Sequence, residues 1–134
     1  MFVPYKSDDG ALIPWEYLAA AAATYKAGQL LTVTSGKLAA IAADSTALPP
    51  YLCMADQTAE AGDLLPVQRI SKTSIYETTL SAAAAGAVVG GKLQIAAGGE
   101  FAKAGAGAFE IVSIDGTAVG DAVFGRWVEP PATV

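Results

Sequence analysis

The stretch QLLTVTSGKLAA, Gln29 to Ala40, predicts the fold class. Its first half is rich in Leu, Val and Thr, which favour extended backbone. Ser35-Gly36 then offers the positive φ of a tight hairpin turn, and apolar residues return at Leu38. The stretch therefore predicts two antiparallel β-strands joined by a short turn.

Similar short segments continue through the chain, with a glycine roughly every 8 to 12 residues, a spacing typical of small sandwiches and barrels. Strands are expected near residues 29–34, 37–42, 51–55, 64–70, 74–80, 92–97, 100–103, 108–114 and 121–128. The alanine run at residues 19–23 is too short for an isolated helix. The expected fold is all-β, a small Gly/Ala-rich β-barrel or β-sandwich with at most short helical turns.

Two further pairs of residues, Gly98-Gly99 and Asp115-Gly116, are expected to place glycine at the positive φ of a hairpin turn. The first pair also takes part in a weak internal similarity, because residues 28–40 can be laid on residues 91–103. That alignment matches Leu30 with Leu93, Gly36 with Gly99, and Leu38 with Phe101. A true duplication and the ordinary likeness of two glycine-turn hairpins are both open interpretations.

The first 18 residues, MFVPYKSDDGALIPWEYL, show no consistent apolar period and predict an extended N-terminal arm ahead of one β domain at residues 19–134. Pro4 and Pro14 disfavour a helix. The large apolar side chains of this segment are Phe2, Val3, Tyr5, Leu12, Ile13, Trp15 and Tyr17. Such residues are favoured anchors in protein interfaces. The arm could fold back over its own barrel, but we expect it to lie outside that core and to bind partner subunits.

The composition favours association with other protein chains. Hydrophobic residues make up 53% of the chain and charged residues only 16%, so a monomer would have difficulty covering itself with polar groups. This surplus predicts a homo-oligomer. The 8 basic and 13 acidic residues give a net charge of −5, which disfavours nucleic acid and anionic membranes as partners. The charge-free stretch between Glu77 and Lys92 is too short to span a bilayer.

Residue types that carry chemistry are scarce. The chain has no histidine, which removes the commonest general base and metal ligand and argues against an enzyme. Its single cysteine, Cys53, excludes an internal disulfide and suits synthesis in a reducing cytoplasm. Because Leu52 and Met54 flank Cys53 and no basic residue is near, a buried inert thiol is expected.

The segment GAVVGGKL at residues 86–93 has the spacing of a phosphate-binding loop through Lys92. Leu93 then replaces the Ser or Thr that would hold magnesium, and the following LQIAAGG alternates like a strand. A nucleotide site is therefore not expected. We predict no catalytic residues, no cofactor and no metal site.

Five segments together resemble one group of tailed-bacteriophage head proteins. They are ALIPWEYL (residues 11–18), TYKAGQLLTVTSGKLAA (24–40), PPYLCMAD (49–56), PVQRISKTSIYETTL (66–80) and EIVSIDGTAVGDAVFGRWV (110–128). The group is the capsid decoration, or cement, proteins. The resemblance implies a compact β protein that binds the major capsid protein on the outside of an expanded capsid, as a trimer at three-fold sites. It also implies synthesis in the host cytoplasm and a final location on the virion surface.

A second function class stays open beside the decoration protein. A carbohydrate- or protein-binding β module, such as a head-fibre or tail-associated domain, would need an exposed aromatic platform flanked by polar groups. The later aromatic residues fall within strand patterns and are expected in the core. Both function classes therefore need the aromatic residues of the arm as their binding surface.

Overall fold

The computed structural model describes residues 1–10, 12–42 and 45–129, and its regular secondary structure there is almost entirely β. The strands are β1 (Val3–Ser7), β2 (Trp15–Ala19), β3 (Ala23–Tyr25), β4 (Leu30–Thr34), β5 (Lys37–Ala40), β6 (Tyr51–Cys53), β7 (Gln57–Ala59), β8 (Leu64–Arg69), β9 (Ser74–Thr79), β10 (Lys92–Ile95), β11 (Ala102–Ala104), β12 (Phe109–Ile114) and β13 (Ala122–Trp127). One 3-10 turn, η1 (Ala97–Gly99), joins β10 to β11. The all-β prediction is confirmed, and the nine strands expected after residue 28 are present as β4, β5, β6 and β8 to β13.

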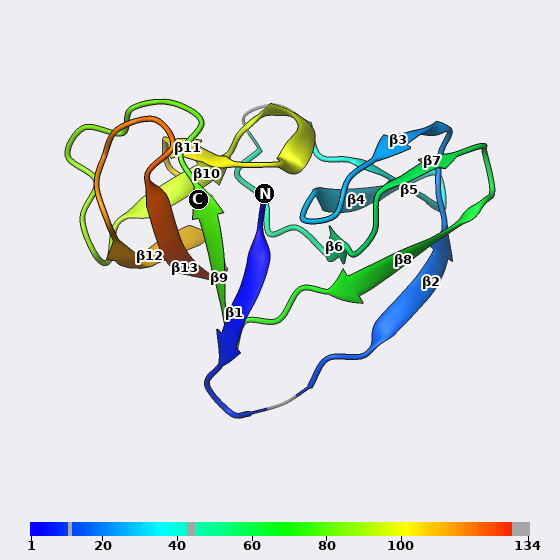
Figure 1. Cartoon of the computed structure of the whole chain (residues 1–134), viewed down its shortest axis with the longest axis horizontal. Helices are drawn as coiled ribbons and strands as arrows, with labels where there is room; N and C mark the ends of the chain where they lie inside the picture. The colour runs from blue at the N-terminus through cyan, green and yellow to red at the C-terminus, as the bar shows by residue number, and fades with distance from the viewer. Residues whose placement is uncertain (11, 43–44, 130–134) are drawn as a thin grey trace, which may run out of the picture.

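Two curled antiparallel sheets lie side by side (Figure 1). The first lobe has the strand order β2-β8-β6-β4-β5, and the second has β9-β13-β12-β10-β11 with β1 added beside β9. Each sheet curls until its ends meet: Ala20 forms a parallel bridge with Leu38, and Leu80 forms one with Ala102. Strands β3 and β7 form a separate pair at the outer end of the first lobe (Figure 1).

The two lobes are structural repeats of one five-stranded unit. Their strand orders match position by position once β1 is set aside, and so do the bonds at the sheet corners. The Ala20 N–H donates to the Asp63 carbonyl at 2.9 Å, and the Leu80 N–H donates to the Asp121 carbonyl at 3.1 Å. Each of these aspartates also accepts a backbone N–H three residues before it, from Glu60 and from Ala118. A Gly-Asp pair therefore makes the same turn in both lobes.

The repeat includes both hairpins detected in the sequence, but with a shifted register. Leu38 pairs with Val33 on β4, and its equivalent Ala102 pairs with Ile95 on β10. Counting back along the strands makes Leu31, and not Leu30, the equivalent of Leu93. The turn with η1 is two residues longer than the Ser35-Gly36 turn, so an alignment without gaps matches neither strand correctly.

The turn predictions hold for two of the three sites. Ser35 and Gly36 both have positive φ, as do Gly98 and Gly99. The prediction for Asp115-Gly116 is wrong because Gly116 has no positive φ. A side chain at Gly116 would instead collide with the carboxylate of Asp121, so close approach explains the glycine there.

One large core joins the lobes. It contains Phe109 and Trp127 of the second lobe together with Leu30 and Leu52 of the first. The buried Gln29 side chain adds a hydrogen bond across the junction, donating to the Gly98 carbonyl at 2.7 Å. A smaller core under the first sheet holds its remaining buried side chains, including Tyr25, Leu31, Leu38, Leu65 and Val67.

The expected N-terminal arm at residues 1–18 contributes to both lobes. β1 pairs with β9, and β2 pairs with β8. Phe2 is only 1% exposed and belongs to the large core, where its ring centroid lies 5.5 Å from that of Phe109 and 5.6 Å from that of Trp127. The expectation that this segment stays outside the core is therefore wrong for Phe2, since the junction between the lobes offers it a closed apolar site.

Leu80→Ala should lower the free energy of unfolding by about 2 to 5 kcal/mol, because Leu80 is buried in the large core at a sheet corner. Urea denaturation followed by circular dichroism measures this. Val88→Ala removes an exposed aliphatic side chain and serves as the control, with an expected change within about 0.5 kcal/mol. Equal effects for the two variants would contradict the assignment of Leu80 to the core.

Candidate functional site

The start of the chain presents exposed apolar side chains on a fixed strand. Val3 and Tyr5 project from β1, which is held by antiparallel pairing with β9. The ring of Tyr5 packs edge-on against Phe124, with 4.8 Å between centroids, and still keeps most of its surface in solvent. These two side chains are therefore exposed but not free to move as on a loose tail.

The connection from β1 to β2 is tied to the fold at both ends. The Asp8 N–H donates to the Thr73 carbonyl at 2.7 Å, and the Asp8 carboxylate accepts from Arg126 at 2.8 Å. At the other end, the Gln68 side chain donates to the Ile13 carbonyl at 2.8 Å. Leu12, which lies between these ties, is 96% exposed.

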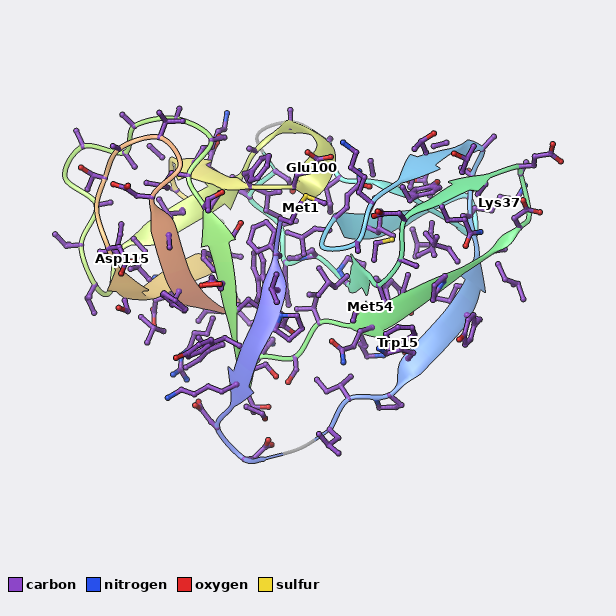
Figure 2. All side chains as sticks on the ribbon, viewed as in Figure 1. Met1, Trp15, Lys37, Met54, Glu100 and Asp115 are labelled. Atoms are coloured by element: carbon purple, nitrogen blue, oxygen red, sulfur yellow. The ribbon has the colours of Figure 1, made fainter. Side chains whose placement is uncertain are left out.

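β2 carries two exposed aromatic residues, Trp15 and Tyr17. Trp15 is 51% exposed and Tyr17 is 61% exposed, and Figure 2 labels Trp15 at the first residue of the strand. Alternation places both on the face opposite Leu18, which packs against the smaller core. Leu64 of β8, paired with Ala19, is exposed on the same outer face.

Glu16 alternates with Trp15 and Tyr17 onto the other face of β2. It lies 3.5 Å from Arg69 in an exposed ion pair. The Arg69 guanidinium also lies 5.3 Å from the centre of the Tyr51 ring and donates to its hydroxyl at 3.2 Å. An exposed ion pair of this kind adds little stability.

A shallow hollow of about 300 Å³ lies between β1 and the connection that follows it. Tyr5, Leu12 and Ile13 line its apolar part, and Gln68 and Ser74 line its polar part. Three of the residues predicted from sequence as partner anchors therefore meet at one depression. Its volume lies at the lower end of the range typical of small-molecule pockets.

Six of the seven predicted partner-binding residues are available at the surface. We call them the N-terminal apolar strip: Val3, Tyr5, Leu12, Ile13, Trp15 and Tyr17. Ile13 is half-buried, and the other five are exposed. Phe2 is the exception, because it is buried between the lobes and has no surface to offer a partner. Partner binding by the strip stays a prediction.

A second exposed apolar group was not predicted from sequence. Val88 and Val89 in the loop before β10 and Val119 in the loop before β13 are all largely exposed. The two loops contact each other, since the Ala84 N–H donates to the Thr117 carbonyl at 2.8 Å. The sequence signal for this group was the pair of glycines after Val88 and Val89, because valines in a glycine-rich loop have no sheet to pack against.

The residues considered for chemistry have structural surroundings. Cys53 is fully buried, as predicted, and its thiol donates to the Ala55 carbonyl at 3.1 Å. Burial raises the pKa of this thiol, which lowers the thiolate fraction at neutral pH. Lys92 is the first residue of β10, so the segment after GAVVGG is a strand, as expected. Its ammonium group lies 3.6 Å from the Glu110 carboxylate.

Within residues 1–10, 12–42 and 45–129, no group of three or more Cys, Asp or Glu side chains is placed to hold a metal ion. In the same part of the chain, no helix has the length and apolar character needed to cross a membrane. Comparison with protein-family models and with curated proteins finds no match to the chain. The surface strip is thus the feature from which a function has to be argued.

Phe2→Ala should destabilise the protein by about 3 to 5 kcal/mol, because it leaves a cavity beside Phe109 and Trp127. Val3→Ala, one residue along at an exposed site, should change stability by no more than about 0.5 kcal/mol. Thermal and urea unfolding of both variants provides the comparison. A neutral Phe2→Ala would mean that the ring is not part of the core.

Proposed function

We propose that the chain is a structural decoration protein that binds the outer surface of an expanded bacteriophage capsid and stabilises it. It acts without catalysis and without a cofactor, as a trimer at three-fold or quasi-three-fold sites. The major capsid protein is its partner. The protein is made in the host cytoplasm and ends on the virion surface.

The observation that carries this proposal is the N-terminal apolar strip on an otherwise rigid β framework. Trp15 and Tyr17 expose more than half of their surface on a paired strand. Aromatic side chains in such a setting lose little conformational entropy on binding and are frequent interface hot spots. Strips of this kind favour contact with another protein surface.

Stabilisation of a shell needs no chemistry, only selective binding. A ligand that binds the expanded shell and not its disassembled or unexpanded form stabilises the expanded form by mass action, by roughly 2.7 kcal/mol per site at 100 times its Kd. A trimer presents three copies of the strip, so its second and third contacts form at high effective concentration. A modest contact per subunit is therefore sufficient.

In solution the protein should have about three times the 13.5 kDa mass of the chain. The reason is the hydrophobic surplus of the chain, part of which a monomer leaves in water. Size-exclusion chromatography with light scattering at micromolar concentration measures the mass. A monomer throughout the accessible concentration range would argue against the trimer.

The double variant Trp15→Ala/Tyr17→Ala should bind expanded shells of the cognate major capsid protein at least roughly tenfold more weakly than the wild type, as expected for removal of two aromatic anchors. Co-sedimentation with expanded and unexpanded shells measures the occupancy. Both residues are exposed, so the variant should keep its fold.

The matched control is Val88→Ala/Val89→Ala, which truncates two exposed apolar residues at the far end of the second lobe. It should bind expanded shells as the wild type does. Loss of binding in this control alone would assign shell contact to the loops and not to the strip. Failure of the wild-type protein to bind expanded shells would refute the proposed function.

A second candidate function is a carbohydrate- or protein-binding module. The observation in its favour is the exposed Trp15 and Tyr17 pair with Gln68 directly opposite Trp15 on β8, because sugars stack on aromatic rings and hydrogen-bond to flanking polar groups. A glycan array probed with the labelled protein separates the two. Binding that Trp15→Ala abolishes would favour the module.

A further inference from the structure

The outer edges of β2 and β9 are equivalent in the two repeated lobes, but only one of them is covered. β9 and β2 occupy equivalent positions at the ends of their five-stranded units. β1 covers the outer edge of β9 by antiparallel pairing. No strand of the described part of the chain pairs with the outer edge of β2 between Trp15 and Ala19.

The direction of the backbone groups identifies which residues are open. The Ala20 N–H points to β8's side and donates to Asp63, and main-chain groups alternate between the two edges of an antiparallel strand. The N–H and C=O groups of Trp15 and Tyr17 therefore face away from β8. Their equivalents on β9 are Ile75 and Glu77, the residues that pair with β1.

The covered and the open edge differ in how they resist further pairing. β1 carries a proline, a lysine and a bulge between Pro4 and Lys6, all of which discourage another strand from adding to it. β2 has no proline or bulge, and its one charged residue, Glu16, is held by Arg69 of β8. The outer edge of β2 is therefore an unprotected edge.

We propose that the outer edge of β2 is a strand-accepting site for an extended segment of a partner protein that resembles β1. The segment runs antiparallel to β2 and exchanges main-chain hydrogen bonds with Trp15 and Tyr17. Under the proposed function, the capsid protein supplies this segment. The strand-accepting site rests on the proposed function only for the identity of that partner. The chain's own β1 does not supply it, because β1 is already paired with β9.

The side-chain chemistry of the segment follows from the equivalent site. Val3 of β1 lies opposite Glu77, the equivalent of Tyr17, and Tyr5 of β1 packs on Phe124. The equivalent of Phe124 in the first lobe is Pro66, which pairs with Tyr17. A β-branched residue opposite Tyr17, followed by an aromatic ring over Pro66, therefore fits the open edge.

The probe is the synthetic peptide MFVPYKS, residues 1–7 of this chain, titrated into the isotope-labelled full-length protein. Saturable NMR shift changes are expected at the Trp15 indole and at the Ala19 amide. A scrambled peptide of the same composition controls for non-specific apolar contact and should cause none. Absence of saturable changes, or equal changes with both peptides, would overturn the site.

Two variants test the geometry of the edge. Tyr17→Pro removes an outward N–H that has no partner within the described chain, a change that edge strands tolerate, and should weaken peptide binding about tenfold. Tyr17→Phe keeps the N–H and the ring and should bind as the wild type does. Equal affinity of the two variants would refute main-chain pairing.

A further experiment does not depend on whether Tyr17→Pro folds. The peptide with N-methyl groups on Val3 and Lys6 lacks the donors that face β9 in the intact chain, and it should bind the wild-type protein about tenfold more weakly. Shift changes confined to β9 would mean displacement of β1 and would overturn the proposal. If the wild-type protein does not bind the peptide but Tyr17→Pro has a lower oligomeric mass in solution than the wild type, the edge of β2 contacts a second copy of the chain. That result would also overturn the proposal. Shell co-sedimentation reports on the proposed function separately.

Discussion

Burial of the Phe2 ring at the junction of the lobes is the interaction on which the arrangement of the molecule depends. The ring contacts Phe109 and Trp127, and the Phe2 N–H donates to the Gly28 carbonyl at 2.8 Å. Gly28 has a φ of 90°, and a side chain there would collide with Met1 and Phe2. Figure 2 shows Met1 and Glu100 together at this junction. One residue thus fixes the chain start to both lobes and aligns β1 with β9.

The sequence predicted nine of the ten described strands after residue 28 because their local signals agree: β-branched and apolar residues alternate, and glycines mark the turns. The three-residue strands β3 and β7 were missed. β1 and β2 were missed because Pro4 and Pro14 weaken the strand pattern, although edge positions tolerate proline. Phe2 could not be assigned from sequence. An apolar residue near a terminus is equally compatible with a core and with an interface, and only the contact between distant strands decides.

The strip was predictable for a different reason. Large apolar side chains in a segment without helical or strand periodicity are poor candidates for a core, so all seven were expected outside it. Six of them lie at the surface, and Phe2 does not. The repeat was barely visible in the sequence, because few equivalent positions of the two lobes have the same residue type. The geometry of the repeat depends on backbone hydrogen bonds at the Gly-Asp turns, where Gly62-Asp63 and Gly120-Asp121 are the same two residues in both lobes.

The difference between the two lobes bears on how such a molecule avoids uncontrolled assembly. If the equivalent edges of β2 and β9 were both open, copies could pair edge to edge through two sites, and a contact that does not close on itself generates fibres. β1 covers β9 and ends the second sheet with Pro4, Lys6 and a bulge. One edge of the pair is then left for a strand from outside. A repeated fold in which one of two equivalent edges is covered can accept a partner strand at the other edge and stop there.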